Sequence, residues 1–126
     1  MKAQLLVLTF VVTTVGAAQQ VAAPQSTEKR VIQLPGSLPG LPFSSAVQVG
    51  NVLYLSGQIG VLPGTRQLVD TGVAKETQQA LENIKAVLAH AGSSMERVFK
   101  CTVFLANMRD YDEMNRVYAT YYPKDP

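Results

Sequence analysis

Cysteine, histidine and tryptophan are almost absent from this sequence, which has one Cys, one His and no Trp in 126 residues. A single cysteine excludes an internal disulfide, and so few ligands exclude a Cys/His metal cluster. No apolar run reaches the roughly 20 residues that a membrane-spanning helix requires. The 11 Lys and Arg nearly balance the 9 Asp and Glu and form no basic cluster of the kind that binds nucleic acid. We therefore expect one small domain with no metal, no cofactor and no nucleic acid partner.

The first 18 residues contain most of the excess apolar character of the chain. They combine Lys2, an apolar run from Leu5 to Val15 and small residues that end at Ala18. This order is typical of a secretory signal peptide, which is removed from the mature protein. A buried helix is the alternative, but the threonines in the run disfavour it. We expect a signal peptide at 1–18, a secreted or periplasmic protein, and no membrane contact after cleavage.

The rest of the chain divides into a lead-in and one domain. Residues 19–28 are rich in Ala and Gln without periodicity, so we expect a flexible lead-in to a domain at 29–126. Gly50-Asn51 is a two-residue junction typical of a hairpin, and it separates predicted strands at Ala46–Val49 and Val52–Ser56. Apolar and β-branched residues predict two further strands, at Lys29–Leu34 and Val98–Leu105.

Two segments show the three- and four-residue apolar spacing of helices that lie on a core. The first is Val73–Ala91, with Asp70 or Thr71 as its N-cap and Gly92 as the residue that ends it. The second is Arg109–Tyr122, whose apolar side is predicted to contain Tyr111, Met114, Val117, Tyr118 and Tyr121. Two helices on one face of a mainly antiparallel sheet predict an α+β domain with two layers.

The two rare residues, His90 and Cys101, have structural explanations. His90 lies in the last turn of the first predicted helix, where a cationic side chain complements the helix dipole, so we expect capping rather than catalysis. Cys101 shares one face of its predicted strand with Val103 and Leu105, so we expect a buried and inert thiol. An intermolecular disulfide is the alternative in an oxidising compartment.

The most distinctive local feature is Ser56-Gly57-Gln58-Ile59-Gly60, at the end of a predicted strand. A hydroxyl followed by a residue without a side chain allows a ligand to approach the backbone closely. An ordinary turn is the alternative, because glycines are common where strands end. The sequence therefore offers a ligand-binding hypothesis here but no nucleophile, phosphate loop or metal site.

Several longer motifs resemble those of a known family. They are LPFSSAVQVGN (41–51), LYLSGQIG (53–60), ETQQALENIKAVLAHAG (76–92), KCTVFLANMRDYDEMN (100–115) and VYATYYP (117–123). In this order they resemble the reactive-intermediate imine deaminase family, also called Rid or YjgF and labelled endoribonuclease L-PSP. The likeness covers nearly all of the chain after the signal peptide and lead-in.

The resemblance implies a fold like that of chorismate mutase, a homotrimer, and a ligand pocket at each subunit junction. Members of the family hydrolyse 2-imino acids and their enamine tautomers to 2-oxo acids and ammonia, without a cofactor. Such a substrate requires an arginine to hold its carboxylate, and a base or hydrogen-bond acceptor to place the attacking water.

Residue by residue, the resemblance transfers a substrate-binding set but no catalytic residue. Ser56 and Gly57 match the strand-end ligand contacts, and Asn115 matches an asparagine on the second helix. Phe43 stands where a tyrosine is common, which keeps a pocket wall without its hydroxyl. The family's arginine would follow Pro126 and its glutamate would lie on the strand beyond, so we expect a domain that is incomplete at its C-terminus and lacks its last strands.

Two functions remain open on these grounds. The first is an exported deaminase of imino acids, active in its complete form. The alternative is a non-catalytic trimer that binds a 2-oxo acid without the catalytic Arg and Glu. Arg66, in a loop, is one substitute for the missing arginine, whereas Arg116 is expected to face away because neighbours on a helix diverge by about 100°. Ribonuclease activity is disfavoured, since the sequence has neither a basic face nor a pair of histidines.

Overall fold

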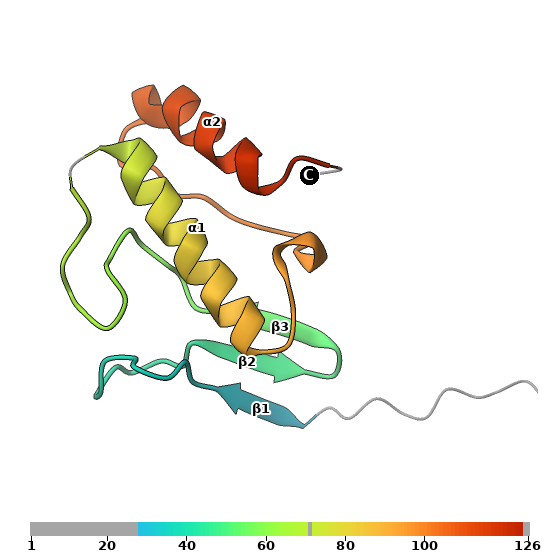
Figure 1. The fold of residues 1–126 in the computed structure, drawn as a ribbon. Helices are drawn as coiled ribbons and strands as arrows, with labels where there is room; N and C mark the ends of the chain where they lie inside the picture. Colours follow the sequence, from blue (N-terminus) through green and yellow to red (C-terminus); the bar gives the residue numbers. More distant parts are fainter. Residues whose placement is uncertain (1–27, 71, 125–126) are drawn as a thin grey trace, which may run out of the picture.

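The computed structural model describes residues 28–70 and 72–124 (Figure 1). The expected signal peptide at 1–18 and nearly all of the expected lead-in at 19–28 lie outside the described residues. Within the described ranges, no helix is both long enough and apolar enough to cross a membrane.

The first part of the described chain forms a three-stranded antiparallel sheet in the order β1-β2-β3. Its strands are β1 Lys29–Ile32, β2 Ala46–Val49 and β3 Val52–Leu55. The predicted hairpin is confirmed: Val49 lies opposite Val52, and Gly50 has a φ of 59°, which glycine adopts without steric cost. β1 is shorter than predicted because its pairing with β2 stops where Ile32 lies opposite Ala46.

Helix α1, Val73–His90, closely matches the predicted helix. Its last turn closes at Gly92, which has a φ of 79°, and the Ser93 N–H donates to the Leu88 carbonyl at 2.8 Å. This left-handed glycine after the helix satisfies carbonyls that would otherwise lack donors. His90 is exposed in the last turn, as its predicted capping position requires.

The start of α1 differs from the prediction. Gly72 occupies the N-cap position, and no side chain caps the helix there. Asp70, one of the two predicted caps, instead forms an exposed ion pair with Lys75 at 3.4 Å. The other predicted cap, Thr71, lies outside the described residues.

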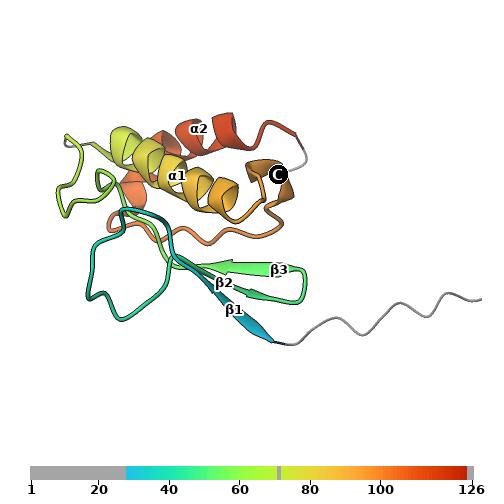
Figure 2. The same ribbon diagram turned by 60° about the horizontal axis from the view of Figure 1, so that its bottom comes forward.

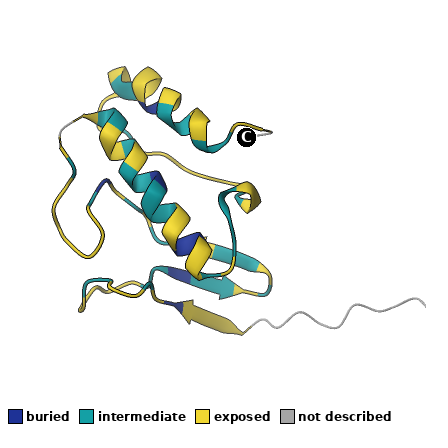
Figure 3. Cartoon of the chain, in the orientation of Figure 1, coloured by how far each residue is buried: buried dark blue, intermediate teal, exposed yellow. Residues whose placement is uncertain are grey.

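The core lies between α1 and the sheet. Ile32, Ala46 and Val87 are buried together, at 7%, 1% and 2% exposure. Partly buried apolar side chains surround them, namely Leu34, Leu53, Leu55 and Ala91. Tyr54, between the two leucines of β3, is 62% exposed because alternate residues of a strand point to opposite faces. Figure 3 shows the buried positions on α1 and the sheet.

The strand predicted at Val98–Leu105 is wrong. The segment follows a short 3₁₀ turn, η1 Met95–Arg97, and runs as extended chain that pairs with no strand in the described part of the molecule. Phe99 and Phe104 are 81% and 92% exposed, and the predicted buried thiol of Cys101 is exposed too. Tyr118 and Tyr122 of α2 lie near Cys101, but this contact leaves the thiol exposed.

The second predicted helix is present with shifted bounds. Helix α2 is Tyr111–Tyr121, preceded by a 3₁₀ turn, η2 Met108–Asp110. The Asn107 side chain accepts from the Arg109 N–H at 3.0 Å and so begins the turn. Of the residues predicted along one side of the helix, Met114 is buried and Tyr111, at the first position of α2, is 47% exposed.

The two helices form one layer on the same side of the sheet (Figures 1 and 2). They are joined by a hydrogen bond in which the Tyr121 hydroxyl donates to Glu82 Oε1 at 2.7 Å. An antiparallel sheet with two helices on one face is the α+β arrangement that the sequence predicts. The loop that leaves β3 passes the start of α1, and this crossing positions the candidate site.

Candidate functional site

The first candidate residue, Ser56, is fixed at the end of β3. Its backbone N–H donates to the Ser45 carbonyl at 3.1 Å, and its Oγ donates to the same carbonyl at 3.3 Å. Ser45 is itself anchored, because its Oγ accepts from the Leu34 N–H at 3.0 Å. The Gln58 side chain donates to Ser56 Oγ at 3.2 Å. The hydroxyl of Ser56 is therefore held in one orientation by the Ser45 carbonyl and the Gln58 side chain.

Gly57 is exposed, and the space around it is open. A methyl group built at its Cα would meet no atom of the described residues within 4 Å, and its φ lies outside the positive range that favours glycine. Its N–H donates to no acceptor in the described ranges. Neither packing nor backbone conformation requires a glycine here, so the residue leaves an accessible backbone amide beside the fixed Ser56.

Gly60, three residues further on, is a glycine that packing does require. A Cβ at this position would lie 2.7 Å from Glu76 Cα and 2.9 Å from the Glu76 carbonyl oxygen. The loop therefore crosses the first turns of α1 with its backbone in direct contact with the helix. The two glycines of the motif have different roles. Gly60 allows the loop backbone to contact α1, and Gly57 leaves its own backbone amide accessible.

Asn83 of α1 ties this loop to the helix. Its Nδ2 donates to the Ile59 carbonyl at 3.1 Å and to the Val61 carbonyl at 2.9 Å. Its Oδ1 accepts from Gln79 Nε2, one helical turn earlier, at 2.9 Å. Every hydrogen of the Asn83 amide group is thus used in holding the two carbonyls that flank Gly60.

Phe43 lies in the loop between β1 and β2 and is 53% exposed. It lines a shallow hollow of about 460 Å³ whose other walls are residues of the same region, Gln33 and Ser37 to Ser44. Two residues after Phe43, Ser45 makes the contacts to Ser56 described above. The structure therefore brings the Phe43 loop and the end of β3 next to each other.

Asn115 is exposed on α2, in the helical layer. No hydrogen bond among the described residues connects it with Ser56 or with the Phe43 loop. Arg116 and Arg66, considered as substitutes for a carboxylate-binding arginine, are both exposed and form no ion pair within the described ranges. The arrangement thus groups Ser56, Gly57 and the Phe43 loop, and leaves Asn115 apart from them.

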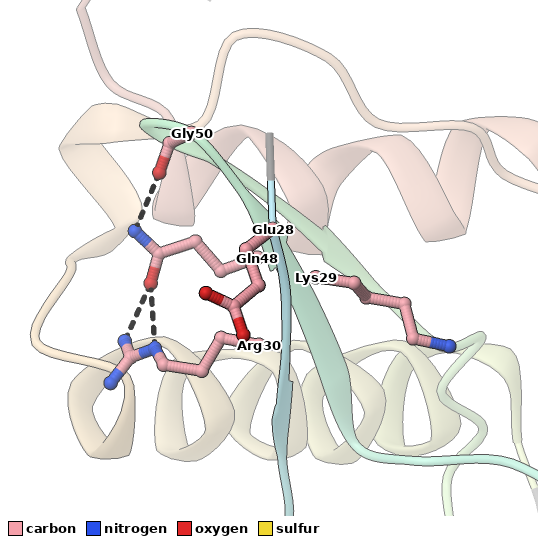
Figure 4. A pocket seen from close by; sticks show the side chains of 5 residues that line it. All are labelled: Glu28, Lys29, Arg30, Gln48 and Gly50. Carbon is pink, nitrogen blue, oxygen red and sulfur yellow. Dashed lines mark hydrogen bonds between the residues drawn. The ribbon is translucent and has the colours of Figure 1, made fainter. Parts of the chain in front are cut away.

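A second hollow, of about 480 Å³, lies at the opposite end of the hairpin (Figure 4). Gln48 connects its walls: Oε1 accepts from Arg30 Nε at 3.0 Å, and Nε2 donates to the Gly50 carbonyl at 2.9 Å. Arg30 and Gln48 are direct partners across β1 and β2, which explains the contact. Gly50 and Ser56 flank β3 at its opposite ends. Arg30, which lies at the Gly50 end, is therefore not placed to bind a ligand at Ser56.

The tyrosines near the end of α2 do not provide a general base at neutral pH. Burial, followed by the neighbouring Cys101 thiol, raises the pKa of Tyr118 and of Tyr122 above the ordinary value of 10.0. Burial and the hydrogen bond to Glu82 raise the pKa of Tyr121 to about 12. These hydroxyls stay protonated at neutral pH, and the Tyr121 hydroxyl donates to Glu82.

Metal binding has no support in the described part of the chain, where no group of three or more His, Cys, Asp or Glu side chains comes together. What the site offers is a hydroxyl, a free backbone N–H and an apolar ring. These groups fit a small polar ligand with a carboxylate or carbonyl oxygen that accepts from the N–H.

Residues 37–126 match the protein-family model described as endoribonuclease L-PSP. The chain belongs to this family. A curated relative from Mus musculus, named 2-iminobutanoate/2-iminopropanoate deaminase, is 46% identical over 81 residues, which cover 64% of this chain and 60% of the mouse protein. The chain thus spans less than two thirds of that relative's length. The motif-based resemblance to Rid proteins is confirmed.

Solved structures agree with this assignment. The Yersinia pestis protein YyfA, described as a protein of unknown function of the conserved Rid family, has a TM-score of 0.70 and 36% identity, covering 75% of this chain and 76% of its own. Escherichia coli TdcF, described with bound serine, has a TM-score of 0.68 and 29% identity, covering 75% of this chain and 74% of its own. The predicted α+β fold of the family is thereby confirmed.

Sequence reasoning missed Ser45, Gln79 and Asn83, the residues that hold the candidate site in place. Asn83 contacts carbonyls more than twenty positions earlier in the chain, at separations of 24 and 22 residues. The only local signal is the spacing of Gln79 and Asn83, which puts two amides on one side of a helix. Nothing in that spacing indicates which loop crosses there.

Proposed function

We propose that the protein hydrolyses 2-imino acids, or their enamine tautomers, to 2-oxo acids and ammonia. The observation that carries the proposal is the end of β3, where Ser56 is held by Ser45 and Gln58 while Gly57 presents an unused N–H to open space. The 46% identity to a mouse protein named as a deaminase of 2-iminobutanoate and 2-iminopropanoate supports the reaction class.

The same groups fit the ligand chemistry. The carboxylate of a small imino acid accepts well from a backbone N–H such as that of Gly57. Phe43 lines a hollow in the adjacent β1–β2 loop, and we assign to it the apolar wall for a short side chain. The relative described with bound serine holds a ligand with a carboxylate next to a nitrogen-bearing carbon, as in a 2-imino acid. We assign substrate binding to Ser56, Gly57 and Phe43, and Asn115 joins them only if another subunit or another conformation brings it near.

A homotrimer is part of the proposal. The face of the sheet opposite the helices presents a row of apolar side chains, in which Val31 pairs with Val47 and Val47 pairs with Tyr54. Val31 and Tyr54 are 54% and 62% exposed. An exposed apolar face of this kind favours association with another subunit. Sedimentation analysis of the purified protein tests the homotrimer. A monomer at all concentrations would reject this part of the proposal.

A second candidate function is binding of a 2-oxo acid without turnover. It is favoured by one observation: within the described ranges, no arginine or glutamate side chain is hydrogen-bonded to Ser56 or to the loop that follows it. This candidate predicts saturable heat on titration of a 2-oxo acid into the folded protein, with no acceleration of imine hydrolysis.

The deciding experiment measures ammonia released from freshly generated 2-iminobutanoate, compared with the spontaneous rate. We expect acceleration by the protein and a loss of substrate affinity in Gly57→Ala, whose methyl group enters the open space without disturbing the fold. Thermal unfolding of the variant serves as the control. Ammonia release at the spontaneous rate, by protein shown to be folded, would reject the deaminase proposal and leave the binding candidate.

Export to the periplasm or the medium is a further part of the proposal and rests on residues 1–18 alone. N-terminal sequencing of protein from its native compartment tests it. A mature N-terminus near Ala18 is expected, and an intact Met1 would reject the signal peptide.

A further inference from the structure

We propose that Asn83, oriented by Gln79, is a positioning residue that sets the ligand-binding backbone of Ser56 and Gly57. Neither residue is a substrate contact in the proposed site. They act from α1 on the loop that carries the contacts. The inference rests on the proposed function for its kinetic readout, but its structural readout is independent of any substrate.

The geometry requires the Asn83 amide to have one orientation. Two carbonyl oxygens, of Ile59 and Val61, face its Nδ2 at 3.1 and 2.9 Å, so only the NH₂ side of the amide group suits them. The other side accepts from Gln79 Nε2 at 2.9 Å. Without that donor the Asn83 amide loses a contact that opposes a flip, and a flip would put its oxygen against two carbonyl oxygens. Gln79 therefore stabilises the orientation that Asn83 needs.

The loop depends on these polar contacts more than on apolar burial. Ile59, between the ligand-binding residues and Gly60, is 64% exposed, and Leu62 is 38% exposed. Gly60 has no side chain to bury, although its backbone lies against Glu76. Backbone hydrogen bonds also hold the loop further along, where the Gly60 carbonyl accepts from the Val69 N–H at 2.9 Å. The two hydrogen bonds from Asn83 fix the position of the loop relative to α1 as the backbone leaves Gln58.

The consequence for the site follows from chain connectivity. Ser56 is held at one end by Ser45, and the carbonyl of Ile59 is held at the other end by Asn83. Only Gly57 and Gln58 lie between these two fixed points. Holding both ends of such a short segment fixes the direction of the free Gly57 N–H, and this preorganises it for a ligand.

The test compares wild type with Asn83→Ala, Gln79→Ala and the control Gln78→Ala, which changes an exposed amide on the same helix. We expect Asn83→Ala to raise KM for imine hydrolysis by roughly tenfold, as loss of about 1.4 kcal/mol of binding would do, with little change in kcat. Contacts made equally to substrate and transition state change KM alone. Gln79→Ala should shift KM in the same direction by a smaller factor, and Gln78→Ala should match wild type.

NMR order parameters of the Gly57 and Gln58 backbone N–H groups provide the substrate-independent readout. We expect lower order parameters in Asn83→Ala than in the Gln78→Ala control, under conditions where both remain folded. A lower melting temperature with unchanged KM and unchanged Gly57 order parameters would show that Asn83 only supports the fold, and would overturn the inference. If wild type releases no ammonia, the proposed function fails, and the order parameters alone decide the positioning role.

Discussion

The sheet beneath α1 and the extended segment at 98–105 have similar apolar sequences but opposite environments. In the first region, Ala46 and Val87 are 1% and 2% exposed. In the second, Phe99 and Phe104 are 81% and 92% exposed, and Figure 3 shows the segment as mostly exposed. The hairpin has a neighbouring strand and a helix above it, whereas the segment has no strand partner among the described residues. Burial here is decided by what lies next to a segment.

The contrast also explains where the candidate site is found. The end of β3 is supported by the covered region through Ser45 and, beyond the loop, by Asn83 of α1. A fixed backbone amide requires rigid elements on both sides, and the covered region supplies them. Within the described ranges, the extended segment has no strand partner that would support it in the same way.

The largest effect is expected from truncation in the covered region. Ile32→Ala removes a side chain that packs with Ala46 and Val87 in the core. Loss of buried methyl groups together with the resulting cavity should lower the free energy of unfolding by about 3 kcal/mol. Urea denaturation of variant and wild type measures it. A loss below about 1 kcal/mol would show that the region is packed no better than the extended segment.

The contact between the β3 loop and α1 gives the next largest effect. Gly60→Ala places a methyl group 2.7 Å from Glu76 Cα, so loop or helix must shift, at a cost of about 2 kcal/mol. The matched variant is Gly57→Ala, whose methyl group meets open space and whose stability should equal wild type. Both are compared by thermal unfolding. Equal melting temperatures for the two variants would contradict the close contact at Gly60.

A smaller effect is expected from the hydrogen bond between the helices. Tyr121→Phe removes the donor to Glu82, a partly exposed contact worth about 1 kcal/mol at neutral pH. The Tyr121 hydroxyl, followed by Lys85, lowers the pKa of Glu82 below 4.5, so this contribution is present above pH 4.5 and is lost as the pH falls through the lowered pKa.

At alkaline pH, the stabilisation by the Tyr121–Glu82 contact falls as the pH rises. Burial and the Glu82 contact raise the pKa of Tyr121 from 10.0 to about 12, so its stabilising effect is present below pH 10 and is lost as the pH rises towards 12. The free energy of unfolding, measured from pH 3 to pH 11, should differ most between wild type and Tyr121→Phe at neutral pH. A difference that does not depend on pH would contradict the pairing.

The smallest effect on stability is expected in the extended segment. Phe104→Ser changes a side chain that is 92% exposed, so the free energy of unfolding should change by less than about 0.5 kcal/mol. The same substitution should reduce self-association, since it removes a large exposed aromatic ring. Urea denaturation and light scattering measure the two effects. A destabilisation comparable to that of Ile32→Ala would mean that the segment is covered in solution.

Local patterns predicted the elements whose signals lie within a few residues. The Gly50-Asn51 turn joined the two strands that flank it, and Gly92 marked the end of α1, because both depend on backbone conformations that glycine favours. The cap of α1 was predicted wrongly. It depends on how the chain approaches the start of the helix, which residue types at that end do not determine.

The sequence by itself determined the family, the hairpin and both helices. It also pointed to Ser56-Gly57, where a glycine follows the end of a strand, since each of these features depends on residue types close together in the chain. The tertiary structure alone decided that the extended segment is uncovered, that Cys101 is exposed, and that Asn83 holds the loop beyond Gly57. These outcomes depend on contacts between distant parts of the chain. A strand needs a partner and an amide needs carbonyls within about 3 Å, and only folding brings them together.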